Sequence, residues 1–415
     1  MIFEQIVWRD LGCASYLVGC QECAKAIVVD PPLDVDLVLS ACERVGARLI
    51  GIIETHTHAD HVSGHGLLAA QTDAWIAVHE SAGVAYEHRA LRDGDELDVG
   101  AIRLTVVHTP GHRPEHCSLL VADRSRSDEP WMALTGDSLF VGDVARPDLA
   151  VAGAEGAAVL HASLRDRLLT LEDGVEIFPG HVAGSLCGKG MSSRTSTTLG
   201  FERRNNAMLA PMAVDEFVRL ANDNLGARPP NVERIVALNR GPLLRDLAEP
   251  RVVHELQGGE QVLDVRPAEA FADRHLAGSL NAPLAGTGFG TRAGSVLDAG
   301  REVVVAAADP AQAADAMRRL RAVGCTEIAL LDPAVLLTGE ERFDTLSMGD
   351  LVASADGLQL VDVRDPGEQP ALPGALRVPY RDLDLADLTS LDPARPVAVV
   401  CQTGSRTCAR CSARA

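Results

Sequence analysis

Four side chains that can bind a metal fall within six consecutive positions of the segment IIETHTHADHVSG, residues 52–64. They are His56, His58, Asp60 and His61. Imidazole nitrogens and carboxylate oxygens are ligands for zinc and for redox-active iron. Because one metal ion needs only about three or four protein ligands, the segment could serve a single metal or contribute to two.

Three later segments place another side chain of this kind directly after an apolar stretch. TVVHTPGH ends at His112, MALTGD ends at Asp137 and VEIFPGH ends at His181. In two of them a Pro-Gly turn precedes the histidine, which lets the backbone approach a site closely. We therefore predict one metal site assembled from four segments of the chain.

The elements that must position these residues are short strands. Residues 33–46 have a helical period and stop at a glycine, so a helix is expected among the strands. The predicted strands are apolar or β-branched stretches that end in a turn-forming or polar residue, and they cover 15–19, 26–30, 48–54, 74–80, 102–110, 117–123 and 131–137. This pattern indicates a mixed α/β domain.

The strand at residues 48–54, RLIGIIE, is expected to be central, with the ligands just past its carboxyl end, where open α/β sheets bind their ligands. Alternate residues of an extended backbone point the same way. We therefore expect His56, His58 and Asp60 to share one face. His61 is expected to turn in as the chain bends.

The second half of the chain contains an internal repeat. QVLDVRPAEAF and LQLVDVRDPGEQ carry the same Asp-Val-Arg triplet, at residues 264–266 and 362–364. Each copy continues through a glycine-containing loop to a second buried strand, and helical stretches such as 312–324 lie between strands, which favours small parallel sheets with helices on both faces. The predicted domains are residues 1–245, 246–343 and 344–415.

The segments THTHADH, TPGH, TGDSLFVGDVARPDL and FPGH resemble those of the metallo-β-lactamase superfamily, and specifically its persulfide dioxygenase branch. The resemblance implies an αββα sandwich for the first domain. In hydrolytic relatives such as glyoxalase II the seven ligand-type residues hold two metals. In persulfide dioxygenases three of them hold one iron, and the matching residues here are His56, His112 and Asp137. The other four would orient ligands and substrate or hold a second metal, and they are His58, Asp60, His61 and His181.

The two metal chemistries differ. Two imidazoles and one carboxylate on one face of Fe(II) leave neighbouring positions open for a sulfur donor and O2. A zinc pair would instead lower the pKa of a bridging water for hydrolysis. Ligand types alone do not choose between them. One Fe(II) per chain follows from the resemblance, and one or two zinc ions per chain are the alternative.

The repeated segments resemble the rhodaneses, which are sulfurtransferases. In VAVVCQTGSRT a strand leads to Cys401 and a tight loop with Gly404 and Arg406. Backbone N–H groups of such a loop, together with Arg406, would stabilise a Cys401 thiolate and persulfide. The first copy has alanines and Asp309 at this place, so it lacks a sulfur carrier and is expected to be structural or a docking surface. Because the chain ends at Ala415, the second domain is expected to be incomplete.

The composition of the chain excludes some classes of binding partner. A formal net charge of -20 and a pI near 5.0 argue against nucleic acid and anionic membrane surfaces. We find no signal peptide and no membrane-spanning stretch, so a cytoplasmic protein with reduced thiols is expected. Ten cysteines are irregularly spaced, and the pair Cys20 and Cys23 favours a hairpin turn over a redox pair.

Taken together, the two resemblances imply an enzyme that oxidises a low-molecular-weight persulfide, R–S–SH, with O2 to sulfite and thiol at Fe(II). Cys401 would move sulfane sulfur between persulfide, sulfite and thiosulfate. A persulfide oxidase and a sulfurtransferase share substrates, which explains their fusion. The alternatives are a zinc-dependent, glyoxalase II-like thioester hydrolase and a non-catalytic sulfur carrier or sensor. A homo-oligomer is expected.

Overall fold

The structure is a computed structural model and describes residues 1–353, 357–365, 372–383 and 388–401. The chain divides into two compact units. The first comprises Met1–Leu247 with Ala322–Gly324, and the second comprises Ala248–Arg321 with Cys325–Ala415.

The first unit begins with a six-stranded sheet in the order β1-β2-β3-β4-β5-β6. The pairs β1·β2 and β2·β3 are antiparallel, and the pairs from β3 to β6 are parallel. Its strands are β1 (Ile2–Trp8), β2 (Cys13–Cys20), β3 (Lys25–Val29), β4 (Arg48–Ile53), β5 (Trp75–His79) and β6 (Arg89–Leu91).

A second six-stranded sheet of this unit has the order β12-β11-β10-β9-β8-β7. Only β10 and β11 pair in parallel, while the other neighbours are antiparallel. The strands are β7 (Glu96–Val99), β8 (Ile102–His108), β9 (Cys117–Asp123), β10 (Met132–Gly136), β11 (Glu176–Pro179) and β12 (Thr197–Thr198).

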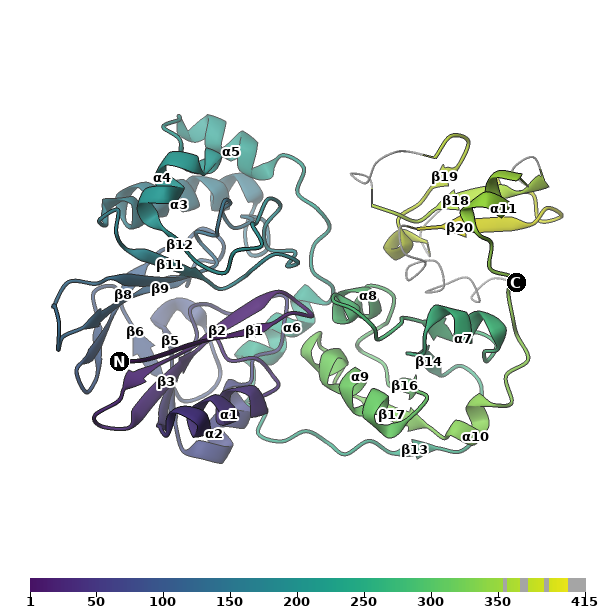
Figure 1. Cartoon of the computed structure of the whole chain (residues 1–415), viewed down its shortest axis with the longest axis horizontal. Coiled ribbons are helices and arrows are strands. Elements are labelled where there is room, and N and C mark those ends of the chain that lie inside the picture. The colour runs from purple at the N-terminus through teal and green to yellow at the C-terminus, as the bar shows by residue number, and fades with distance from the viewer. Residues whose placement is uncertain (354–356, 366–371, 384–387, 402–415) are drawn as a thin grey trace. The chain divides into compact units, whose positions relative to one another are not determined.

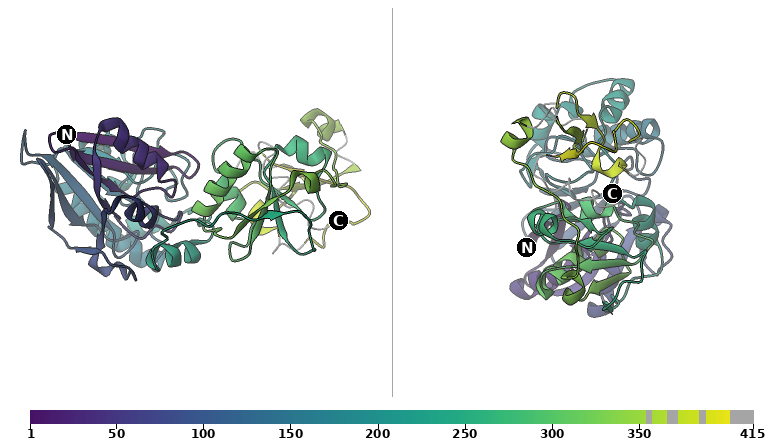
Figure 2. Two further views of the ribbon diagram at one scale, coloured as in Figure 1. Left: turned by 90° about the horizontal axis from the view of Figure 1, so that it is seen from below. Right: turned by 90° about the vertical axis from the view of Figure 1, so that its right-hand side faces the viewer.

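The two sheets lie face to face between two layers of helices (Figures 1 and 2). Alternate residues of the strands point inward, and one shared core contains Ile27 and Ile53 of the first sheet and Leu104 and Leu119 of the second. Helices α1 (Asp36–Val45) and α2 (His65–Thr72) pack on the first sheet, whereas α3 (Gly153–Asp166), α4 (Leu199–Asn205) and α5 (Val214–Asn222) cover the second. This is the predicted αββα sandwich.

The second unit contains a five-stranded sheet in the order β13-β17-β16-β14-β15, and all its pairs are parallel. Its strands are β13 (Val252–Val253), β14 (Gln261–Asp264), β15 (Leu280–Asn281), β16 (Val303–Ala306) and β17 (Ile328–Leu331). Its helices are α7 (Ala268–Asp273), α8 (Phe289–Gly294), α9 (Pro310–Ala322) and α10 (Pro333–Leu336).

The second copy of the repeat begins with α11 (Met348–Ala353) and forms a parallel sheet in the order β19-β18-β20. Its strands are β18 (Gln359–Asp362), β19 (Leu376–Arg377) and β20 (Val397–Val400). In both copies the aspartate of the Asp-Val-Arg triplet ends a strand and pairs with the arginine of the same triplet, at 2.6 Å in the first copy and 2.9 Å in the second. The predicted internal repeat and parallel sheets are therefore confirmed.

The strands and the helix expected in the first half also form, and α1 ends where Gly46 adopts a left-handed conformation with φ of 66°. Among the described residues, no helix is both long enough and apolar enough to cross a membrane.

Candidate metal centre

The segment that carries the four clustered ligand-type residues, 56–61, is a loop. β4 ends at Ile53, and the chain from residue 54 onward bends instead of remaining extended. The extended backbone on which a shared face was expected for His56, His58 and Asp60 ends before these residues. Their side chains still turn toward one region, where the centroids of the His56 and His58 rings lie 4.4 Å apart, and their ligand atoms fall into three neighbouring clusters.

The first cluster consists of His56, His112 and Asp137. Their ligand atoms lie within 4.8 Å of one another, and all three residues are buried. Asp137 Oδ2 lies 3.5 Å from His112 Nε2 and 4.0 Å from His56 Nε2. His56 Nε2 and Asp137 Oδ2 are buried without a hydrogen-bond partner. Since buried polar atoms are nearly always paired, the arrangement fits a bound metal ion.

Hydrogen bonds on the far side of each imidazole leave its Nε2 atom available. Thr55 Oγ1 donates to Asp30 Oδ2 at 2.8 Å, so it accepts from His56 Nδ1 at 2.9 Å. His112 Nδ1 donates to the carbonyl oxygen of Arg146 at 2.9 Å. With Nδ1 protonated in both rings, the lone pairs of both Nε2 atoms face the cluster, as in many metal-binding histidines.

Asp137 is positioned by its neighbours. Its backbone N–H donates to His116 Nε2 at 2.8 Å, and its Oδ1 accepts from His181 Nδ1 at 2.7 Å. Gly136 has φ of 47°, and a Cβ there would lie 2.6 Å from His116 Nε2, so only glycine fits. Burial opposes ionisation of Asp137, but His181 holds the pKa of the carboxyl well below its usual range.

A second cluster contains Asp60, His61 and His181 and is joined by Cys13. The Cys13 sulfur lies 3.6 Å from both Asp60 Oδ2 and His61 Nδ1, and His181 Nε2 lies 2.8 Å from Asp60 Oδ2. His61 Nε2 is buried without a hydrogen-bond partner. These four residues could therefore hold a second ion. The sequence did not indicate Cys13, which begins β2 and meets His181 through a backbone bridge.

His58 belongs to a third cluster with two acids. Its Nε2 lies 3.2 Å from Asp30 Oδ1 and 3.1 Å from Glu54 Oε2. Burial opposes protonation, but these carboxylates raise the pKa of His58 well above its usual value. His58 Nδ1 is buried without a hydrogen-bond partner, so this nitrogen remains available to a metal ion. Asp30 and Glu54 follow β3 and β4 directly, so the strand-end pattern that identified the other ligand-type residues could also have identified them.

Glu115 joins the loops that carry His56 and His112. Its Oε1 accepts from Arg113 Nε at 2.8 Å, from the Thr57 N–H at 3.3 Å and from Arg240 Nη2 at 3.1 Å. Burial opposes ionisation of Glu115, but Arg113 outweighs it and lowers the pKa to about 2. Arg240 lies on α6 (Val232–Arg240), where Asn239 also donates to the backbone carbonyls of the ligand loop.

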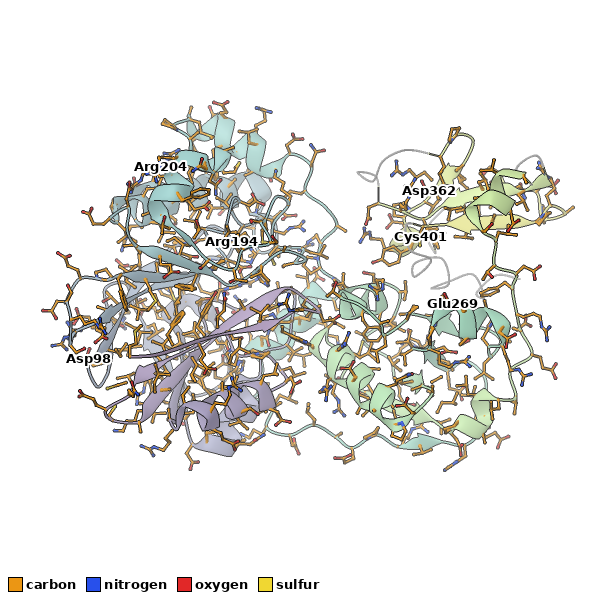
Figure 3. All side chains as sticks on the ribbon, in the orientation of Figure 1. Asp98, Arg194, Arg204, Glu269, Asp362 and Cys401 are labelled. Carbon is orange, nitrogen blue, oxygen red and sulfur yellow. The ribbon has the colours of Figure 1, made fainter. Side chains whose placement is uncertain are left out.

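In the second unit, Cys401 directly follows β20. Asp362 of β18 is the register partner of Val400, so Cys401 and the Asp-Val-Arg triplet lie at the same edge of the sheet (Figure 3). In the first copy the position equivalent to Cys401 is occupied by buried Ala307, which directly follows β16. Arg406 lies outside the described residues.

Comparison with known protein families gives one match for each of these two folds. The model of the metallo-beta-lactamase superfamily matches residues 8–181, and that of the rhodanese-like domain matches residues 249–334. The chain carries a metallo-beta-lactamase domain and a rhodanese-like domain. This fold and its histidine and aspartate clusters indicate that the metallo-beta-lactamase domain binds a metal.

Several known proteins are similar to the chain. Persulfide dioxygenase ETHE1, mitochondrial, of Bos taurus is 29% identical over 230 residues, which are 54% of this chain and 82% of that protein. Hydroxyacylglutathione hydrolase of Polaromonas sp. is 31% identical over 170 residues, which are 40% and 61%. A crystal structure titled metallo-beta-lactamase from Staphylococcus aureus has a TM-score of 0.71 at 29% identity, and it covers 80% of this chain and 98% of that chain.

Proposed function

We propose that the metallo-beta-lactamase domain oxidises a low-molecular-weight thiol persulfide with O2, giving sulfite and the thiol. One Fe(II) would be held by His56, His112 and Asp137. The convergence of their ligand atoms, which lie within 4.8 Å of one another, is the observation that carries the proposal. The similarity to persulfide dioxygenase ETHE1 over 82% of that protein supports the substrate class.

Fe(II) in such a three-residue site would provide adjacent open positions at which O2 and a sulfur donor can react. Neighbouring groups of the protein orient the three residues that would bind the metal. Thr55 and the Arg146 carbonyl hold the His56 and His112 rings, while His181 occupies one oxygen of Asp137 and leaves the other for the metal. Each of these outer contacts fixes a ligand before any substrate arrives.

His181 also connects the first two clusters, since its two ring nitrogens contact Asp137 and Asp60 at 2.7 and 2.8 Å. It could therefore hold a proton between the two carboxylates. Cys13 and Cys187 lie next to it, but burial raises the pKa of both thiols, that of Cys187 to about 12. Burial therefore disfavours the two thiolates unless a bound metal ion stabilises them.

For the second unit we propose sulfane-sulfur transfer at Cys401. Its thiolate would attack the outer sulfur of R–S–SH, forming a Cys401 persulfide and releasing R–S⁻. Sulfite would then take that outer sulfur as thiosulfate and restore the thiolate. Cys401 is half-buried at the end of a parallel strand, and Arg406 would stabilise the charged sulfur.

A second candidate function is zinc-dependent thioester hydrolysis. The cluster of Cys13, Asp60, His61 and His181 could complete a two-metal site next to the first, and two metals would activate a bridging water. The similarity to hydroxyacylglutathione hydrolase supports this alternative.

The deciding experiment measures metal content and O2 uptake on the same purified protein, with glutathione persulfide as the substrate probe. We expect about one iron per chain, as a single three-ligand site predicts, and persulfide-dependent O2 uptake. Asp137→Ala should lose both, because it removes the only carboxylate of the cluster. Asp98→Ala, which changes an exposed carboxylate of β7 (Figure 3), should retain both. Two zinc ions per chain, with thioester hydrolysis and no O2 uptake, would contradict the proposal.

A further inference from the structure

Cys20 and Cys23 lie at the two sides of one hairpin turn. β2 ends at Cys20, β3 begins at Lys25, and these two residues are register partners. The predicted turn is therefore confirmed. Cys20 is buried and Cys23 is exposed, so the pair combines a shielded sulfur with one that a molecule in solution can reach.

The turn between β7 and β8 brings the two sulfur atoms together. A Cβ on Gly100 would lie 2.5 Å from the Cys20 sulfur and 3.0 Å from the Cys23 sulfur. Gly100 also has φ of 61°, so both space and backbone conformation require glycine here. The two thiols therefore lie against the same point of a neighbouring turn.

The surroundings stabilise negative charge on one of the two sulfurs. Backbone N–H groups, that of Ala101 foremost, lower the pKa of the Cys20 thiol. Burial and the nearby Cys20 raise the pKa of the Cys23 thiol. Elsewhere in this unit, burial raises the pKa of Cys42 to about 11. Cys20 is thus set apart by backbone amides directed at its sulfur, which is the kind of environment that activates thiols.

A metal is a poor explanation for this pair. Within the part of the chain that the structure describes, Cys20 and Cys23 belong to none of the histidine, cysteine and carboxylate groups that could hold an ion. Two adjacent thiols without further ligands can instead exchange electrons by forming a disulfide.

We propose that Cys20 and Cys23 are a redox-active dithiol that low-molecular-weight persulfides oxidise to a disulfide. This site lies apart from the metal clusters, and its reaction requires neither iron nor O2. It takes the same class of sulfur compound as the proposed function, but the two reactions can succeed or fail independently.

The reaction balances in two steps. Exposed Cys23 attacks the outer sulfur of R–S–SH, so that a Cys23 persulfide forms and R–S⁻ leaves. The Cys20 thiolate then attacks the Cys23 sulfur, forms the Cys20–Cys23 bond and expels HS⁻. The two cysteines lose two electrons, which reduce the sulfane sulfur to sulfide. The two cysteine protons end on the released thiol and sulfide.

The test treats the reduced, metal-containing protein with glutathione persulfide without O2, then unfolds it and alkylates the free thiols. Chymotrypsin cleavage after Tyr16 or Leu17 separates Cys13 from the pair before mass spectrometry. We expect the Cys20–Cys23 peptide to be unalkylated and lighter by two hydrogen atoms. Cys42 should remain alkylated at the same persulfide concentration, because burial shields its sulfur and raises the pKa of its thiol.

Two variants test the order of steps. Cys20→Ser should accumulate a Cys23 persulfide, detected as one extra sulfur under the alkyl group. Cys23→Ser should leave Cys20 as a free thiol, because its sulfur is shielded from the persulfide and the second cysteine of the pair has been removed. Persulfide-dependent O2 uptake should be unchanged in both variants and shows that they fold. If Cys20 and Cys23 in the treated wild type are alkylated as fully as Cys42, the pair is not redox-active and the proposal fails, whatever the iron-dependent activity.

Discussion

Replacement of Glu115 by glutamine tests whether one buried carboxylate holds the two histidine loops in place. Glutamine keeps the shape and one acceptor oxygen but removes the charge. The pKa of Glu115 falls from 4.5 to about 2 in the folded protein. One pKa unit corresponds to about 1.4 kcal/mol, so the charge contributes about 3 kcal/mol of stability at neutral pH. We expect Glu115→Gln to lose most of that amount.

The sign of the pH dependence follows from the lowered pKa. Above the unfolded pKa near 4.5 the contribution is complete, and it disappears as pH falls toward the folded pKa near 2. The stability difference between wild type and Glu115→Gln should therefore shrink as pH is lowered below 4.5.

Urea unfolding followed by tryptophan fluorescence measures this difference. Trp8, Trp75 and Trp131 are the only tryptophans, and all lie in the first unit, so the signal reports that unit. Glu80→Gln is the matched control, because Glu80 is exposed and its ion pair is with exposed Arg92. Exposed pairs contribute little, and no measurable shift is expected.

Two outcomes would refute this reasoning. If Glu115→Gln unfolds at the same urea concentration as Glu80→Gln, the carboxylate does not brace the loops. If Glu115→Gln is less stable than wild type by the same amount at all pH values, its loss comes from altered packing and the charge is not responsible.

Three further predictions concern the metal and the sulfur carrier. His181→Ala should keep much of the iron while O2 uptake falls about 10- to 100-fold, as for other residues that orient a ligand; loss of metal equal to that of Asp137→Ala would favour a two-metal site. Cys401→Ser should leave O2 uptake intact and raise the sulfite-to-thiosulfate ratio, whereas Ala307→Ser should not change that ratio; an unchanged ratio in Cys401→Ser would exclude Cys401 as the carrier. Removing the metal with a chelator should lower the urea midpoint of the tryptophan signal, because a ligand that binds only the folded state stabilises it, and an unchanged midpoint would mean that the site contributes no folding energy.

The local pattern of the sequence was sufficient to predict which strands are followed by ligand-type side chains that converge. Each of His56, His112 and Asp137 follows a strand closely, and the structure brings all three together. The convergence could be predicted because an apolar stretch followed by a polar residue is a local signal in the sequence. The carboxyl ends of neighbouring strands in a packed sandwich lie close together, so the residues that follow them also lie close together.

The direction of each side chain after the strand ends could not be predicted in the same way. The His58 side chain contacts two acids that lie at the ends of different strands. The Cys13 side chain contacts Asp60 from the start of β2. These contacts join residues distant in the chain and depend on packing. The motif spacing therefore identified the set of ligand-type residues but not its division into clusters.

The engagement of His58 by Asp30 and Glu54 has a consequence for how such enzymes diverge. Both acids lie outside the THTHADH motif, yet they contact Nε2 of one of its histidines, whose Nδ1 is buried without a hydrogen-bond partner. Substitutions at these two strand ends could therefore change how the His58 ring is held, and so how well its Nδ1 meets a metal, without altering any residue of the motif. Asp30→Asn combined with Glu54→Gln would remove both carboxylates from His58. Hydrolytic activity gained by this double variant would trace the divergence of two chemistries to residues that motif comparisons ignore.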